Sequence, residues 1–323
     1  MMESVMRTLV LGAAGFIGTR LVQRLSARGD DLTLVDRYTF DHPAAVAGDI
    51  SDPSFVDRLT EQRFDAVFHL ASSLTLEAEA DPDAAYANNI APLRRLIARN
   101  PGARFNFASS IAVFGGDLPD KVDDDVKALP TTVYGTHKAI SELLLADAHR
   151  RGVVDARILR LPIVLTRPGS PTPTISDRVA AIIREPLAGR RVSCPFAPGT
   201  RIPVASAGAV ASAFVRLDEC DIGDLPAARA MNLPSLTVSV SEMLSAVEHR
   251  GAEGLVDFEP EAQLQLIVDG WPRVFTSDAA YKLKIAADTS IDELINDHVG
   301  GGGFKNRQAR EPANPLPVEA THR

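Results

Sequence analysis

The sequence predicts an α/β fold in which helices cover both faces of a doubly wound parallel sheet, with a smaller C-terminal α/β lobe beside it. Five short apolar runs are typical of buried strands, and they occupy residues 8–11, 31–35, 66–70, 105–108 and 158–161. Apolar residues at helical spacing separate them and predict helices at 53–62, 82–98 and 134–151. Alternation of strands and helices builds a parallel sheet covered on both faces. Shorter helical patterns at 240–249 and 291–299 indicate the second lobe.

A glycine-rich turn follows the first strand directly. The segment GAAGFIG at residues 12–18 leads into a helical pattern that Gly29 closes as a C-cap. Glycines let the backbone turn tightly and approach a pyrophosphate, and a helix N-terminus presents N–H groups and a positive dipole end to that anion. This unit predicts a Rossmann-type dinucleotide site, which contains Gly12, Gly15, Phe16, Ile17 and Gly18.

An acidic residue ends the second predicted strand. Asp36 follows the run at 31–35, where a carboxylate can accept hydrogen bonds from the two hydroxyls of a ribose. The same carboxylate repels the 2′-phosphate of NADP, so we predict NAD as the cofactor. Arg37 leaves NADP open as the alternative, because a guanidinium at this place can attract a phosphate.

Composition and charge exclude several classes of protein. The 323 residues are 45% hydrophobic, enough for a large core in one or two domains, and the net charge of −8 disfavours a broad nucleic-acid-binding surface. No apolar run is long enough for a membrane helix, and residues 1–7 lack the core of a signal peptide. Cys194 and Cys220 stand apart without a metal-ligand cluster, so we expect no bound metal and a reducing, cytoplasmic location.

Tyr134 and Lys138 suggest a proton-transfer pair. Residues four apart in a helix share one face, and a nearby ammonium favours the phenolate form of a tyrosine. Taken alone, this spacing is also that of an ordinary helix surface.

Several motifs in order now carry a family resemblance. The loop GAAGFIG is followed by GDI at 48–50, HLA at 69–71, FASSIAVFG at 107–115 and YGTHK at 134–138. In this order they resemble the extended short-chain dehydrogenase/reductase family, the NAD-dependent epimerases and dehydratases. The resemblance implies a catalytic triad of Ser110, Tyr134 and Lys138. It also implies further cofactor contacts from Asp49, Ile50, Leu70, Ala71, Ser72, Asn89 and Pro162, with Tyr134 and Lys138 taking part as well.

The family chemistry implied is oxidation of a secondary hydroxyl. Tyr134 removes the hydroxyl proton while the carbon gives a hydride to the nicotinamide, and Ser110 orients the hydroxyl. Lys138 is expected to lower the pKa of Tyr134 and to bind the nicotinamide ribose. Asn89 lies in a segment that departs from the family's usual Asn-x-x-Gly-Thr.

Segments in the second half resemble the D-erythronate dehydrogenase branch of this family. They include LPIV at 161–164, RPGSP at 167–171, NLP at 232–234 and GWP at 270–272. The branch implies oxidation of a four-carbon sugar acid at C2 to a 2-oxo acid. Arg178 and Arg201 are candidates for binding the carboxylate, since guanidinium groups bind carboxylates bidentately, and Thr75 and Ser110 complete the predicted substrate contacts.

The domain division follows from these assignments. We expect an NAD-binding domain at 1–166 with a return segment at 201–218, a substrate lobe at 167–200 and 219–299, and a disordered tail at 300–323. The family implies a homodimer through the Tyr134 helix and the helix before it. The apolar residues Ile140, Leu143, Leu144 and Leu145 suit either that interface or the core.

Two other functions remain open. One is a nucleotide-sugar epimerase or dehydratase with bound NAD, and the other is a non-catalytic regulator that senses the cofactor. The intact Ser110, Tyr134 and Lys138 weigh against the regulator, because a sensor needs no proton-transfer set.

Overall fold

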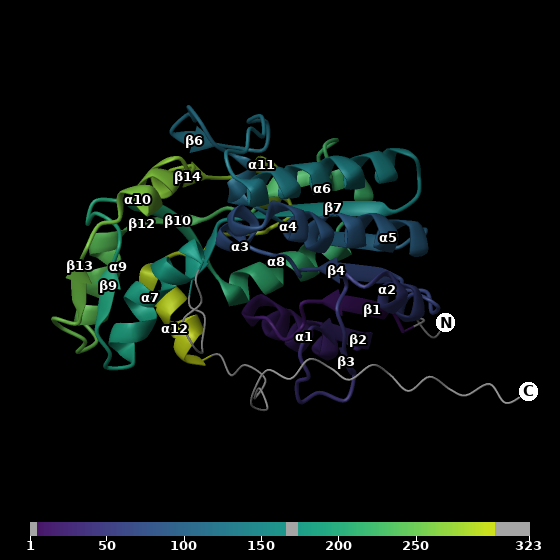
Figure 1. The fold of residues 1–323 in the computed structure, drawn as a ribbon, viewed down its shortest axis with the longest axis horizontal. Coiled ribbons are helices and arrows are strands. Elements are labelled where there is room, and N and C mark those ends of the chain that lie inside the picture. The colour runs from purple at the N-terminus through teal and green to yellow at the C-terminus, as the bar shows by residue number, and fades with distance from the viewer. Residues whose placement is uncertain (1–4, 166–173, 301–323) are drawn as a thin grey trace, which may run out of the picture.

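The computed structural model describes residues 5–165 and 174–300, and its centre is a seven-stranded parallel sheet (Figure 1). The strand order is β11-β7-β5-β4-β1-β2-β3. Apolar side chains fill both faces of its central strands, as expected for a sheet covered on both sides. The strands are β1 (Arg7–Leu11), β2 (Asp31–Asp36), β3 (Ala45–Ala47), β4 (Ala66–His69), β5 (Arg104–Ser110), β7 (Asp155–Leu161) and β11 (Ala230–Asn232).

Helices form a layer on each side of this sheet. On one face α1 (Phe16–Arg28) and α8 (Ala207–Glu219) share a core with the strands, and on the other α2 (Pro53–Leu59), α5 (Ala91–Arg99) and α6 (Val133–Arg150) do so. Two short helices, α3 (Thr75–Ala80) and α4 (Pro82–Asn89), lie beside α6. The predicted doubly wound α/β fold is confirmed.

The second lobe has its own apolar core at one end of the molecule (Figure 1). Its three-stranded sheet joins β8 (Ile163–Leu165), β10 (Arg201–Ser206) and β12 (Leu236–Ser239). Two small sheets pair β9 (Val192–Cys194) with β13 (Val256–Phe258), and β6 (Lys121–Val122) with β14 (Val274–Phe275). The remaining elements are α7 (Ile175–Leu187), α9 (Val240–Glu248), α10 (Ala262–Asp269), α11 (Asp278–Lys282), α12 (Ile291–Gly300) and the 3₁₀ turns Ile111–Val113 and Ile222–Asp224.

Three details differ from the expectations or lie beyond the structure. The helix predicted at 82–98 is two helices that meet at Ile90, because Pro92 lacks an N–H and disfavours helical backbone before it. Strand β11 pairs with β7 in the main sheet, although the expected boundary placed it in the substrate lobe. Most of the expected tail, residues 301–323, lies outside the described residues.

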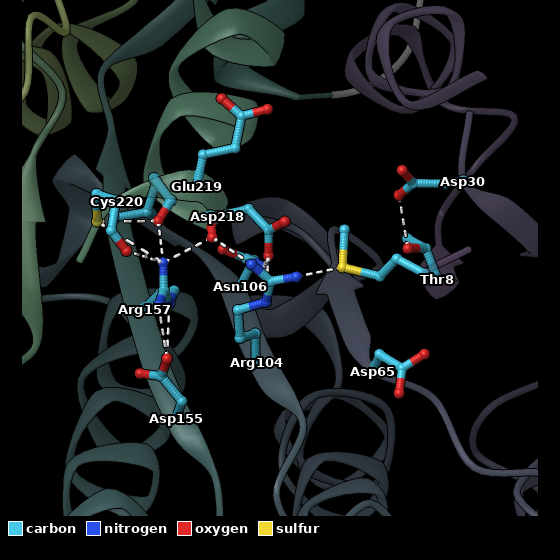
Figure 2. A network of polar contacts seen from close by, with 12 residues as sticks. Thr8, Asp30, Asp65, Arg104, Asn106, Asp155, Arg157, Asp218, Glu219 and Cys220 are labelled. Carbon is cyan, nitrogen blue, oxygen red and sulfur yellow. Dashed lines mark hydrogen bonds and ion pairs between the residues drawn. The ribbon is translucent and has the colours of Figure 1, made fainter. Parts of the chain in front are cut away.

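A buried polar network closes the amino-terminal edge of the main sheet (Figure 2). The guanidinium of Arg157 on β7 donates to the backbone oxygens of Leu217, Asp218 and Cys220 at 2.6, 2.7 and 2.9 Å, which satisfies carbonyls at the end of α8. The Asp218 carboxylate accepts a hydrogen bond from Asn106 of β5 at 2.8 Å. These contacts fasten α8 to this edge, and the chemistry-bearing side chains gather at the opposite one.

Candidate active site

A cavity of about 480 Å³ opens at the carboxyl ends of the parallel strands. Strands β1 and β4 are neighbours there, and the chain leaves them toward opposite sides of the sheet, which is where doubly wound sheets bind ligands. Side chains of the second lobe close the far wall. Most predicted site residues line it, namely Gly12, Gly15, Phe16, Ile17, Asp36, Asp49, Ile50, Leu70, Ala71, Ser72, Thr75, Ser110, Tyr134, Lys138 and Pro162.

The glycine loop is shaped by two close approaches. Gly12 has a φ of 83°, and a Cβ on it would lie 3.0 Å from the backbone nitrogen of Ala71. Gly18 does not line the cavity, in contrast to our expectation of a cofactor contact. A Cβ on Gly18 would lie 2.2 Å from the carbonyl oxygen of Gly12, so this glycine lets α1 pack directly against the loop.

Asp36 presents its carboxylate at the end of β2. One oxygen accepts a hydrogen bond from the backbone N–H of Ala14 at 3.0 Å. Burial raises the pKa of Asp36, and hydrogen bonds from the backbone of Ala14, Arg37 and Tyr38 oppose that rise. The Nε of Arg37 lies 3.5 Å from a carboxylate oxygen of Asp49, so the arginine is paired with an acid of the same wall. This arrangement suits a ribose diol.

Asn89 lies behind the cavity wall, although we expected it to contact the cofactor. Its side chain is 5% exposed, and its oxygen accepts hydrogen bonds from Ser72 Oγ at 3.1 Å and Ser73 N at 2.8 Å. Its nitrogen donates to the carbonyl of Ser73 at 3.1 Å. Asn89 therefore holds the loop after β4 in place, and Ser72 and Ser73 form the surface that faces the cavity.

Ser110, Tyr134 and Lys138 meet on one wall. Tyr134 and Lys138 share a face of α6, with the lysine Nζ 5.5 Å from the tyrosine ring centroid. The phenol is hydrogen-bonded to the side chain of Ser110, which stands at the end of β5. Lys138 also donates to the backbone oxygen of Ala108 at 2.7 Å. The neighbouring Ser109 has a different partner, because its hydroxyl donates a hydrogen bond to the carboxylate of Glu142.

Burial changes the protonation of both residues of the pair. Part of Tyr134 stays accessible at the wall, yet the protein around it raises its pKa to about 12, and only the hydrogen bond with Ser110 opposes the rise. Burial also lowers the pKa of Lys138 to about 7, with the Glu142 carboxylate opposing. Loss of hydration therefore dominates the pKa of both groups in the protein by itself, and the expected lowering of the Tyr134 pKa by Lys138 stays a prediction.

The two arginines predicted to bind a carboxylate do not line the cavity. Arg178 on α7 is exposed, and Arg201 is the exposed first residue of β10, at the end of that strand away from Ser206. Exposed guanidinium groups keep their hydration and need no buried partner. Among the described residues, the cationic side chains of the lining are Arg37 and Lys138.

Sequence reasoning missed several residues of the wall. Ser73 and Leu74 continue the loop after β4. Their position directly after the predicted residues Leu70, Ala71 and Ser72 could have indicated that they also line the cavity. Trp271, which is 9% exposed, reaches the wall from the second lobe, and nothing local in its sequence indicates that placement. The other lining residues that we did not predict include Tyr38, Glu77, Asn88, Thr174 and Ser176.

Comparison with known proteins agrees with this geometry. Residues 8–208 match the model of the NAD dependent epimerase/dehydratase family, a stretch that contains the glycine loop, Asp36 and the triad. The chain belongs to this family. The resemblance inferred from the motifs is therefore confirmed. The protein is an NAD-dependent enzyme that acts on CH–OH groups, and the glycine loop and Asp36 fit that cofactor.

The chain is similar both to dehydrogenases and to an epimerase. The chain is 37% identical to the D-erythronate dehydrogenase of Cupriavidus necator, over 93% of this chain and 99% of that one. It is 33% identical to the D-erythronate dehydrogenase of Haemophilus influenzae, over 91% and 99%. The crystal structure of a nucleoside-diphosphate-sugar epimerase from Agrobacterium tumefaciens superposes with a TM-score of 0.85 at 33% identity, covering 92% of this chain and 96% of that one.

The described residues contain neither a candidate membrane-spanning helix nor a candidate metal cluster. No helix in residues 5–165 or 174–300 is both long and apolar enough to cross a membrane. The same part of the chain contains no group of three or more histidine, cysteine or acidic side chains arranged to hold a metal ion.

Proposed function

We propose that this protein oxidises the C2 hydroxyl of a small, D-erythronate-like sugar acid to a 2-oxo acid. The observation that carries the proposal is the meeting of Ser110, Tyr134 and Lys138 with the NAD-binding loop in one cavity. Similarity to two D-erythronate dehydrogenases over nearly the whole chain supports the substrate class.

The three polar residues have distinct roles in the proposed reaction. NAD, when bound along Gly12, Gly15 and Asp36, supplies the acceptor for the hydride that leaves C2. Ser110 donates a hydrogen bond that orients the substrate hydroxyl. Tyr134 as phenolate takes the hydroxyl proton, and the ammonium of Lys138 stabilises that phenolate on the same helix face.

Neutral donors bind the substrate carboxylate in this proposal. Arg178 and Arg201 are outside the lining, and hydroxyl and amide groups face the cavity near the second lobe. Thr75 on α3, Asn88 on α4 and Ser176 on α7 supply such groups. Hydrogen bonds from neutral donors to a carboxylate are weaker than a bidentate arginine pair, so we expect modest affinity for the acid.

The test is a comparison of substrates with the purified protein and NAD. Four- to six-carbon sugar acids are offered separately, and NADH is followed by absorbance. Net NADH formation with D-erythronate or a close homologue, together with 2-oxo acid in the product, supports the proposal. Absence of turnover with every acid contradicts it.

A nucleotide-sugar epimerase is the second candidate. The similarity to the Agrobacterium tumefaciens protein is the observation that favours it. An epimerase returns the hydride to the same substrate, so it interconverts two nucleotide sugars without net NADH. Chromatography of nucleotide sugars incubated with the protein and NAD distinguishes the two functions.

We also propose a homodimer formed through α4 and α6. Leu143 on α6 is 72% exposed and Tyr86 on α4 is 47% exposed, while Leu145 is buried in the core of the main domain. Two apolar side chains on neighbouring helices suit a self-complementary contact. Light scattering should give a molar mass twice that of the chain, and the Leu143→Glu variant should have the mass of a single chain.

A further inference from the structure

Behind the catalytic wall, the buried carboxylate of Glu142 joins three elements. Glu142 is 7% exposed and accepts hydrogen bonds from Ser109 Oγ on β5 at 2.5 Å and from Arg160 on β7, whose Nη2 lies 2.8 Å away. Ser109 and Arg160 are register partners on adjacent parallel strands. Their side chains therefore project to the same face of the sheet, where α6 brings Glu142 to both.

The same helix face carries the catalytic pair. Tyr134, Lys138 and Glu142 follow one another at intervals of four residues, so they lie in one row along α6. Each meets one of the last three residues of β5. Tyr134 is hydrogen-bonded to Ser110, Lys138 donates to the carbonyl of Ala108, and Glu142 accepts from Ser109. The strand that carries the serine is thus fastened to the helix at three successive points.

Glu142 is also the negative charge that acts on Lys138. Lys138 is 4% exposed, and burial lowers its pKa to about 7 while Glu142 opposes this change. The other titratable neighbours add no negative charge at neutral pH. His69 on β4 is buried and stays neutral because its pKa is lowered to about 3, and Tyr134 stays a phenol until about 12. The guanidinium of Arg160 on β7 pairs with the same carboxylate.

We propose that Glu142 is a positioning residue for the proposed reaction, whose carboxylate holds the end of β5 against α6 and favours the ammonium form of Lys138. It touches neither substrate nor cofactor, since it does not line the cavity. Its effect is exerted through Lys138, which must be cationic to stabilise the phenolate of Tyr134. Through Ser109 it also fixes the residue next to Ser110.

The test is direct titration of Lys138 by NMR in the full chain. The sequence contains six lysines, so a protein labelled with ¹³C at the lysine side chains gives few resonances, and Lys138→Met identifies the one that matters. Glu142→Gln keeps the shape and removes the charge. We expect the pKa of Lys138 to fall by roughly one pH unit or more, because two charges one helical turn apart interact strongly when buried.

Two companion variants separate charge from structure. Asp147→Asn removes an exposed carboxylate from the same helix, paired only at the surface, and should leave the Lys138 pKa unchanged. Glu142→Asp keeps the charge with a shorter side chain and should return the Lys138 pKa toward the wild-type value. Equal pKa values in wild type and Glu142→Gln would overturn the proposal, as would equal decreases in Glu142→Gln and Glu142→Asp.

A combined variant tests the proposal if Glu142→Gln does not fold. Glu142→Gln leaves the buried Arg160 without its counter-charge, which is destabilising. If that variant does not fold, Glu142→Gln is combined with Arg160→Met, and the double variant is compared with Arg160→Met alone so that loss of the arginine charge is common to both. The Lys138 pKa should be lower in the double variant than in Arg160→Met, and equal values in the two would contradict the proposal.

The inference rests on the proposed function only for its effect on rate. In Glu142→Gln, the pH dependence of kcat/KM governed by Lys138 should move to lower pH by the same amount as the NMR titration. The titration needs no substrate. A protein that turns over no sugar acid refutes the proposed function, whereas an unshifted Lys138 resonance refutes the role of Glu142.

Discussion

Lys138 donates a hydrogen bond from Nζ to the backbone oxygen of Ala108 at 2.7 Å, which ties the lysine of the proposed triad to the strand that carries Ser110. The ammonium is held in a buried place and loses hydration there. Its position therefore has a cost in stability that depends on pH.

Lys138→Met should stabilise the fold most at low pH. The folded-state pKa of about 7 lies below the ordinary value of 10.5, so below pH 7 both states are protonated and the cost is fully present. Between these values the unfolded chain binds more protons, and the free energy of unfolding of the wild type rises with pH. The gain from the substitution, on the order of a few kcal/mol, should shrink over that window.

Urea unfolding below pH 7 and near pH 10.5 measures this gain. The exposed Lys282 provides the matched control, because Lys282→Met should change stability little at either pH. A gain for Lys138→Met that is the same at both pH values would show that the lysine titrates normally in the fold.

Tyr134→Phe should reduce oxidation by about 10²- to 10⁴-fold, the usual contribution of a general base, and leave NAD affinity nearly unchanged. NADH absorbance and calorimetric titration with NAD measure the two quantities. Since the pKa of Tyr134 is raised to about 12, the phenolate fraction and the rate of the wild type should both rise with pH. Tyr281→Phe, at a residue that is 54% exposed, is the control, and turnover retained by Tyr134→Phe would refute the assigned base.

Asp36→Asn should weaken the preference for NAD. Loss of a charged acceptor for the ribose hydroxyls corresponds to about 10- to 100-fold in kcat/KM with NAD, while repulsion of a 2′-phosphate also falls. The ratio of kcat/KM for NAD and NADP is the measurement. Asp41→Asn removes the same charge from an exposed loop residue that does not line the cavity, and it should leave the ratio unchanged. An equal ratio in wild type and Asp36→Asn would rule out Asp36 as the determinant.

Gly18→Ala should disturb the glycine loop of the proposed cofactor site by separating it from α1. The new methyl group would lie 2.2 Å from the carbonyl oxygen of Gly12, so either the loop or α1 must move. We expect a loss of stability of about 1 to 3 kcal/mol and weaker NAD binding. Gly199→Ala adds the same methyl group where no atom lies within 4 Å, and it should change neither quantity. Wild-type NAD affinity in Gly18→Ala would show that the loop does not depend on this packing.

Much of the cavity follows from local rules of the sequence. A strand that runs into glycines and then into a helix predicts the dinucleotide loop, and a four-residue spacing places Tyr134 and Lys138 on one face of α6. The carboxyl ends of parallel strands meet at one edge, so Asp36 and Ser110 belong to the same crevice. Each of these inferences needs only neighbours in sequence or in the order of strands.

Tertiary structure decided where several side chains lie, which residues close in sequence do not indicate. Asn89 turns inward to Ser73, and Arg178 and Arg201 stay in solvent, because these placements depend on how the second lobe and the loops pack. Burial and the hydrogen bond with Ser110 act on the pKa of Tyr134, and burial and the Glu142 carboxylate act on that of Lys138; only the folded chain brings these groups together. The sequence by itself determined the fold class and the family, and it predicted the cofactor loop and the proposed triad. Packing, which sets hydration and distance, decided the directions of the pKa shifts and which side chains line the cavity.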